Sequence, residues 1–343
     1  MSAEEVVLPL DAALAAVRQV VPPSPLVEAP DLSRRLGVPV HLKLESLQAT
    51  GSFKVRGAAA RILSLGEAEL RRGVIACSSG NHGLAVAYVA ERVGAHAVVC
   101  VPRWVDPVKL QAIRDHGAEA VVEGATYDQA AAVSERLARE RGLTVVHPFD
   151  DPWVAAGQGT VALEILETLP DVGTVVIPLS GGGLAGGMAW VLGTRGRAVR
   201  TVAVSARRAR VMLESLVLGR PVDLPEEETV ASALAGGIGL RNALTFGLVR
   251  DWVDEHVVVE ESAIRAAMAY AIRSLRVVVE GGGAVGIAAV LEGALSVSDA
   301  RPVVVVVSGG NVSAGVLMEV QTSRNAGEQE VGSVRRSTSE ATR

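Results

Sequence analysis

The sequence predicts an α/β protein of two domains, each built on an open twisted sheet with flanking helices. Short apolar runs alternate along the chain with segments of helical spacing, a pattern typical of parallel sheets. The 343 residues are 49% hydrophobic and include 36 glycines but only 3% aromatic side chains, which is typical of close helix–strand packing. A chain of this length exceeds one small core, so two domains are expected.

The alternation is clearest in the middle of the chain. Strands are predicted over residues 74–77, 97–101, 120–122 and 144–146, and helices over 81–93, 107–116 and 127–141. The segment HPFDDP at 147–152 then interrupts the pattern. We therefore predict a small α/β domain at residues 73–147, inserted into a large domain formed by residues 1–72 and 148–320.

The large domain shows the same alternation on both sides of this insert. Helices are predicted over residues 10–20, 54–65, 155–168, 183–192, 212–218, 261–275 and 284–295, and strands over 38–45, 174–179, 201–204, 256–259 and 303–307. The last strand is five consecutive valines, which predicts burial on both faces. Residues 219–239 are expected to be mainly loop. Residues 321–343 are polar and without apolar periodicity, which predicts a disordered tail.

Charge and composition exclude several classes of function. The net charge of -5 and the sequence pI near 5.8 give no support for nucleic acid as a partner. Cys77 and Cys100 do not make a disulfide framework, so a reducing compartment is expected. No apolar run approaches the ~20 residues of a membrane span, and the N-terminus lacks a signal-peptide pattern. We therefore expect a cytoplasmic protein with no membrane partner.

One lysine, Lys54, lies in an unusual stretch, TGSFKVRGA at residues 50–58. It stands between two glycines and next to Phe53. A lysine desolvated in an apolar pocket has a lowered pKa, and its amine becomes a nucleophile able to form a Schiff base. The alternative is a lysine that extends from the first turn of a helix into solvent. This stretch alone leaves both interpretations open.

A glycine-rich turn, LSGGGLAGG at residues 179–187, follows a predicted strand and opens a helix. Backbone N–H groups of such a turn converge on an anion, and the helix N-terminus adds partial positive charge. Gly181, Gly183 and Gly186 also match G-x-G-x-x-G, but the next strand ends without the carboxylate that a dinucleotide site needs. A small phosphorylated cofactor therefore fits better than NAD. A tight turn with no ligand is the alternative.

Two further turns carry polar groups where a strand ends. In SSGNHG at residues 78–83, Ser79 and Asn81 can bind a carboxylate or a ring oxygen, or can cap the following helix. His82 in this turn is expected to be structural. In VSGGN at residues 307–311, Ser308 can face a pyridine nitrogen or can cap a helix.

Taken together and in this order, these segments resemble the fold-type II pyridoxal-phosphate enzymes of the threonine/serine dehydratase and serine racemase family, which have the fold of the tryptophan synthase β-subunit. The resemblance covers residues 10–320 and includes four more motifs. They are KLE at 43–45, GQGT at 157–160, GGIG at 236–239 and VEG at 279–281.

This resemblance implies that pyridoxal 5'-phosphate is the cofactor and that Lys54 is its Schiff-base lysine. Phe53 would pack on the ring, Asn81 would hydrogen-bond its phenolic oxygen, and Ser308 would face its pyridine nitrogen. The phosphate would rest on four backbone amides, those of Gly181, Gly182, Gly183 and Leu184.

The resemblance also implies where the substrate binds and how it reacts. Its carboxylate is expected at five consecutive residues, Ser78, Ser79, Gly80, Asn81 and His82. The cofactor acts as an electron sink, Lys54 removes the α-proton, and loss of the β-hydroxyl leads to a 2-keto acid and ammonia. Ser79 stands where racemising members have their second acid/base.

The chain departs from the family pattern in two respects. Residues 205, 209 and 211 are not carboxylates, so the divalent cation of some relatives is not predicted and no metal is expected. The segment after residue 321 is too short for the regulatory domain of biosynthetic threonine dehydratases, so control by isoleucine is not expected. Arg207, Arg208 and Arg210, with residues 279–284, resemble dehydratases of hydroxyectoine degradation.

The function expected from these observations is elimination of water from a threonine- or serine-type amino acid by a homodimeric enzyme. Three alternatives remain: a dehydratase acting on a larger hydroxylated amino acid, a serine racemase using Lys54 and Ser79, and a non-catalytic amino-acid-binding module.

Overall fold

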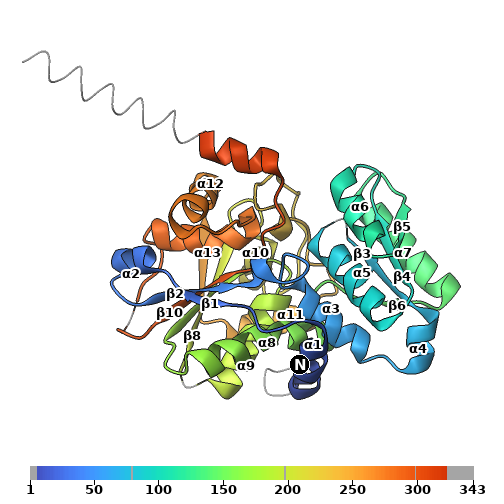
Figure 1. Cartoon of the computed structure of the whole chain (residues 1–343), viewed down its shortest axis with the longest axis horizontal. Helices are drawn as coiled ribbons and strands as arrows, with labels where there is room; N and C mark the ends of the chain where they lie inside the picture. Colours follow the sequence, from blue (N-terminus) through green and yellow to red (C-terminus); the bar gives the residue numbers. More distant parts are fainter. Residues whose placement is uncertain (1–5, 79, 197, 298, 323–343) are drawn as a thin grey trace, which may run out of the picture.

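The computed structural model describes residues 6–78, 80–196, 198–297 and 299–322, and it contains two β-sheets (Figure 1). The larger sheet has six strands, in the order β1 (Leu26–Glu28), β2 (Val40–Leu44), β10 (Val303–Val307), β7 (Thr174–Pro178), β8 (Arg200–Ala206) and β9 (Glu255–Val259). All neighbours are parallel except β1, which is an antiparallel edge strand on β2. The predicted α/β class is thus confirmed.

The valine strand β10 lies in the interior of this sheet, hydrogen-bonded to β2 and β7. Val304 and Val306 belong to the apolar cluster on one face, and Val303, Val305 and Val307 to the cluster on the other. All five are fully or almost fully buried. The prediction of burial on both faces is therefore confirmed, and it follows from helices covering both faces.

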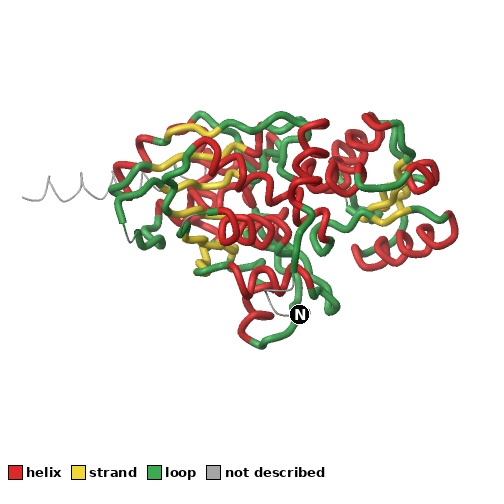
Figure 2. The backbone as a smooth tube through the Cα atoms, turned by 90° about the horizontal axis from the view of Figure 1, so that it is seen from below, coloured by secondary structure: helices red, strands yellow, loops and turns green. Residues whose placement is uncertain are grey.

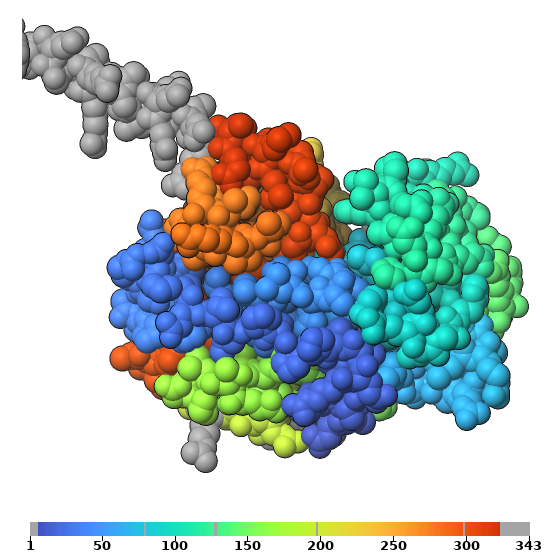
Figure 3. Space-filling view, in the orientation of Figure 1, coloured from blue at the N-terminus to red at the C-terminus, as the bar shows by residue number. Residues whose placement is uncertain are grey.

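Helices cover the two faces of the larger sheet (Figures 1 and 2). The first face packs against α1 (Leu10–Val20), α3 (Lys54–Leu63), α8 (Pro152–Thr168), α9 (Gly183–Arg195), α10 (Val211–Val217) and α11 (Leu244–Trp252). The second packs against α2 (Pro30–Leu36), α12 (Glu261–Tyr270) and α13 (Gly281–Leu291). A helix at residues 314–322, red in Figure 3, lies beside α12, where Glu319 pairs with Arg265.

The smaller sheet is wholly parallel and forms a second lobe (Figure 1). Its order is β5 (Glu119–Val122), β4 (Ala97–Val101), β3 (Val74–Cys77) and β6 (Thr144–Val145). One face packs on α5 (Asn81–Val93) and the other on α7 (Tyr127–Arg141), with α4 (Glu67–Arg72) and α6 (Pro107–Asp115) beside them. Because α3 contacts both α5 and α8, it joins the two sheets.

The structure differs from the predicted elements mainly in short segments. Strand β1 and helices α2, α4 and α11 were not predicted, since none is longer than nine residues and short elements show little periodicity. Gln321 and Thr322 are helical, although they were assigned to the disordered tail; the rest of that tail lies outside the described residues. No helix in the described part is long and apolar enough to cross a membrane.

Helix α13 begins three residues before its predicted start and ends at Leu291 rather than at residue 295. Its first turn consists of glycines, which are poor helix formers. Packing explains them: a Cβ atom on Gly281 would lie 2.2 Å from the carbonyl oxygen of Val230, and one on Gly283 would lie 2.5 Å from that of Gly309. The helix predicted over residues 261–275 ends in one π-helical turn, Ala271–Leu275.

Candidate active site

The carboxyl ends of parallel strands from both sheets meet at one place. Ser52, beyond the end of β2, forms an antiparallel bridge with Gly309, beyond the end of β10. Asn81, which follows β3, is hydrogen-bonded to Glu280 of the larger lobe. Ligands of open α/β proteins bind at this edge of the sheet. We therefore treat this junction as the candidate active site.

Lys54 is the first residue of α3, and its side chain turns into this junction. Its Nζ donates a hydrogen bond to the carbonyl oxygen of Pro148 at 2.7 Å and lies 5.2 Å from the ring centroid of Phe53. Burial lowers the pKa of Lys54 to about 8, although the nearby carboxyl of Glu280 opposes that shift. Part of the amine population is therefore unprotonated near neutral pH. The alternative of a side chain extending into solvent is wrong.

The end of β10 holds the start of α3 in place. The backbone N–H of Phe53 donates to the carbonyl oxygen of Ser308 at 3.0 Å. The Ser308 hydroxyl is buried and lies 3.5 Å from the carbonyl oxygen of Gly282. No helix begins directly after Ser308, since the next one starts at residue 314. The helix-cap alternative for Ser308 is therefore wrong.

The glycine-rich turn presents unpaired amides at the start of α9. Gly182 has φ +87° and stands at the N-cap position of this 13-residue helix. Among the described residues, no acceptor is hydrogen-bonded to the backbone N–H groups of residues 181–184. Four free donors at a helix N-terminus favour an anion such as a phosphate.

This turn lies directly beside the segment that receives Lys54. A Cβ atom on Gly181 would lie 2.4 Å from the ring of Phe149, and one on Gly183 would lie 3.0 Å from its Cβ. Phe149 follows Pro148, whose carbonyl oxygen accepts the bond from Lys54. The amine and the free amides therefore flank the same two residues, 148 and 149.

The turn at residues 78–83, which follows β3, is the part of the candidate site that comes from the smaller sheet. The Ser78 hydroxyl accepts a hydrogen bond from the N–H of Gly80 at 3.2 Å. Gly80 is the N-cap residue of α5, with no side-chain cap bond, so Asn81 does not cap that helix. Ser79, to which the sequence assigned an acid/base role, lies outside the described residues.

His82 is buried, and its imidazole carries no charge in the candidate site. Its Nε2 is 2.8 Å from the carbonyl oxygen of Val146, so this nitrogen carries the proton and donates. Burial, helped by the charge of Lys54, lowers the pKa of His82 to about 3. The imidazole is therefore neutral at physiological pH, as a structural histidine is.

Sequence reasoning assigned no role to four residues at this junction: Pro148, Phe149, Thr245 and Glu280. Pro148 and Phe149 were recognised only as part of the crossing between domains. The Thr245 hydroxyl donates to the carbonyl oxygen of Gly181 at 2.7 Å, but it lies in a helix that was not predicted. Glu280 was noted only as part of the motif at 279–281.

Arg56, two residues after Lys54, stands in a buried cluster of charges. It forms paired hydrogen bonds with both carboxylate oxygens of Glu45, at 2.7 and 2.9 Å, and of Glu164, at 2.6 and 2.8 Å. Glu164 also pairs with Lys43 at 2.6 Å. Two positive and two negative groups make this cluster neutral, and it fixes β2 and α8 to the helix that carries Lys54.

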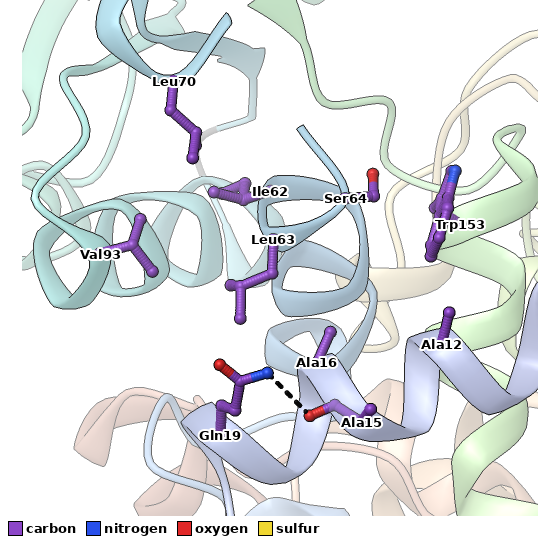
Figure 4. A pocket seen from close by; sticks show the side chains of 10 residues that line it. All are labelled: Ala12, Ala15, Ala16, Gln19, Ile62, Leu63, Ser64, Leu70, Val93 and Trp153. Carbon is purple, nitrogen blue, oxygen red and sulfur yellow. Dashed lines mark hydrogen bonds between the residues drawn. The ribbon is translucent and has the colours of Figure 1, made fainter. Parts of the chain in front are cut away.

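A separate hollow of about 360 Å³ lies near the opposite end of α3, between α1, α3, α4 and α5 (Figure 4). Its lining is mainly apolar and includes Ala16, Leu63 and Val93. Leu63 is nine residues after Lys54, or about 13 Å along the helix, so this hollow is not part of the candidate site. No group of three or more metal-binding side chains occurs within the described ranges.

Comparison with known proteins identifies relatives over almost the whole chain. Residues 17–309 match the family model described as "Pyridoxal-phosphate dependent enzyme". An L-threonine ammonia-lyase of Thermotoga maritima is 40% identical over 301 residues, which cover 88% of this chain and 74% of that protein.

Solved structures agree with this relationship. Maize serine racemase superposes with a TM-score of 0.86 at 32% identity, covering 94% of this chain and 100% of its own. The processed form of threonine deaminase isoform 2 from Solanum lycopersicum gives a TM-score of 0.84 at 34% identity, covering 91% of each chain. Because the family model matches residues 17–309 and relatives of 32–40% identity cover most of the chain, the protein belongs to the family of pyridoxal-phosphate-dependent enzymes, in their fold type II.

Proposed function

We propose that this protein is a pyridoxal-phosphate-dependent dehydratase, or ammonia-lyase, that eliminates water from a threonine- or serine-type amino acid to give a 2-keto acid and ammonia. The observation that carries the proposal is the Lys54 amine, with its lowered pKa, beside the free amides of residues 181–184. The activities named for the Thermotoga and Solanum relatives support this reaction.

We assign each cofactor-binding role to one residue or turn at this junction. Lys54 would hold the aldehyde carbon, and the amides of residues 181–184 would hold the phosphate. Phe53 would lie against the ring, and Asn81 and Ser308 would meet its oxygen and its nitrogen. When bound, the cofactor supplies an electron sink for the substrate α-carbon. A neutral hydroxyl such as that of Ser308 would leave the ring nitrogen unprotonated.

Lys54 is also the base of the proposed reaction. An amine with a pKa of about 8 can take a proton from carbon and return it near physiological pH. The turn at residues 78–82 would bind the substrate carboxylate, because the N-terminus of the 13-residue helix α5 favours negative charge. We further propose that the protein works as a cytoplasmic homodimer.

Racemisation is a second candidate, favoured by the structural similarity to maize serine racemase. Chiral analysis of serine recovered from the reaction separates the two activities. The larger substrate suggested by Arg207, Arg208 and Arg210 stays a prediction. Arg207 and Arg210 are paired with glutamates in the structure. Release of keto acid from threonine, serine, hydroxyaspartate and hydroxyectoine-derived amino acids would identify the substrate class.

The chain makes a sharp test of Lys54 feasible, because it contains only three lysines: Lys43, Lys54 and Lys109. Reducing the bound cofactor onto the protein with borohydride, followed by peptide mapping, should label Lys54 alone. Lys54→Ala should lose keto-acid release, whereas Lys109→Arg, which keeps the positive charge at an exposed position, should keep it. A Lys54→Ala protein that still releases keto acid at the wild-type rate would refute the proposal.

A further inference from the structure

Glu280 occupies a place in the junction that the proposed reaction does not use. It is the N-cap residue of α13, only 8% exposed, and its carboxyl packs so tightly on Gly309 that a Cβ atom there would lie 2.3 Å from Oε1. Its carboxylate oxygen Oε1 accepts a hydrogen bond from Asn81 Nδ2 at 2.8 Å. A buried carboxyl with a specific amide partner at a ligand site calls for a functional explanation.

The other end of the Asn81 amide is fixed as well. Its Oδ1 accepts a hydrogen bond from Asn311 Nδ2 at 2.8 Å, and the same Nδ2 donates to the carbonyl oxygen of Thr50 at 2.8 Å. Both amide protons of Asn311 are therefore used. A flip of the Asn81 amide would place oxygen against the Glu280 carboxyl and nitrogen against the Asn311 donor, so both bonds would be lost.

One amide proton of Asn81 then remains. It has no acceptor among the residues that the structure describes, although the amide itself is held at two points. A donor that is already held in place is suited to an incoming ligand oxygen, because binding then costs little side-chain entropy.

Gly51 permits this arrangement. Its φ of +69° is in the left-handed region, and a Cβ atom there would lie 2.2 Å from Asn311 Oδ1. The side chain of Asn311 can reach Asn81 because residue 51 has no side chain.

From this geometry we propose that Glu280 and Asn311 are positioning residues, which together aim the free N–H of Asn81 at the phenolic oxygen of the cofactor. This inference rests on the proposed cofactor site. It gives a role to the motif at 279–281 and explains why residues from both lobes meet at Asn81, since Asn81 begins α5 of the smaller lobe.

Burial of Glu280 makes this arrangement of hydrogen bonds sensitive to pH. Lys54 of α3 and Lys109 of α6 both stabilise its ionised form, and so does the bond from Asn81. Burial outweighs them and raises the pKa of Glu280 to about 7. An ionised acceptor makes the stronger hydrogen bond. Cofactor affinity should therefore rise as the pH increases through 7.

A double-mutant cycle on apo-protein, read out by titration with pyridoxal 5'-phosphate, tests the proposal. Glu280→Leu and Asn311→Ala should each weaken cofactor binding ~10-fold, the worth of one hydrogen bond. In an Asn81→Ala background the same changes should have less than a ~2-fold effect, because they act only through Asn81. An equal weakening with and without Asn81 would overturn the proposal.

Glu280→Gln provides a second test should Glu280→Leu fail to fold. It keeps the shape and the acceptor but cannot titrate, so the rise of cofactor affinity through pH 7 should become shallower, leaving the part that comes from deprotonation of Lys54. Glu260→Gln is the matched control, since Glu260 is the N-cap residue of α12 and, among the described residues, its ion pair is with exposed Arg207. A Glu280→Gln protein that keeps the wild-type pH dependence would contradict the inference.

These binding measurements do not depend on turnover. If the protein binds the cofactor with the expected coupling but releases no keto acid from any hydroxy amino acid, the proposed function fails and the inference stands. If keto acid is released but the double-mutant cycle shows no coupling, the inference fails and the proposed function stands.

Discussion

Replacing Arg56 by methionine tests how the charge cluster supports the site. The guanidinium has five N–H donors, and all five are used, four on Glu45 and Glu164 and one on Thr160 at 3.1 Å. The side chain is fully buried. Methionine is of similar length but has no charge, so the variant leaves two buried carboxylates facing the single ammonium of Lys43.

The magnitude follows from that imbalance. Removing one partner of a buried ion pair typically costs ~3–5 kcal/mol, because the remaining charge is dry and uncompensated. We expect Arg56→Met to lose this much stability at pH 8. One of these two carboxylates is then buried without a counter-charge, and its pKa should rise above its unfolded value. Its protonation would return part of the loss as the pH falls, so the deficit should be smaller at pH 5.5.

Urea unfolding of apo-protein at the two pH values measures both effects. Arg71→Met is the control: Arg71 pairs with Glu67 on exposed α4, and losing such a pair costs under ~1 kcal/mol. Adding Glu164→Gln to Arg56→Met restores neutrality and should recover part of the stability. A loss below ~1 kcal/mol at pH 8, or an equal loss at both pH values, would refute the reasoning.

Two further predictions concern the junction. Gly51→Ala should lower the free energy of unfolding by ~1–3 kcal/mol, because it adds a clash with Asn311 to an unfavourable φ. Gly94→Ala is the control, since Gly94 has a similar φ but open space around it. It should cost less stability in the same thermal melt. Glu280 has a folded pKa of about 7, above its unfolded value, so its contribution to stability is full below pH ~4.5 and is lost as the pH rises through 7. The melting temperature of apo-protein should therefore fall less between pH 5 and 8 in Glu280→Gln than in wild type, and an identical slope would argue against the raised pKa.

The fold was predictable where apolar runs are bounded by glycine or polar turns. Strands β3, β4 and β10 and helices α5 and α7 have the bounds that the sequence predicted. The three-residue edge strand β1 could not be predicted, because so short a strand shows no alternation. The domain boundaries at residues 73 and 147 stay predictions.

The candidate site was predictable in its parts but not in its connections. Turns that follow strands were recognised from their glycines and hydroxyls. Local spacing cannot show that Asn81, Glu280 and Asn311 share hydrogen bonds, since 199 and 230 residues separate Asn81 from its two partners. The cluster around Arg56 could not be predicted for the same reason, since 108 residues separate Arg56 from Glu164.

The charge cluster and the reactive amine are close in sequence, but the charge of Arg56 is paired with Glu45 and Glu164. Arg56 is two residues from Lys54, and an unpaired guanidinium so near would lower the pKa of the amine. Burial lowers the pKa of Lys54, and the carboxyl of Glu280 opposes that shift. Two carboxylates neutralise Arg56 where it lies. The cluster can therefore hold α3 firmly while the pKa of Lys54 is set by burial in the junction and by Glu280.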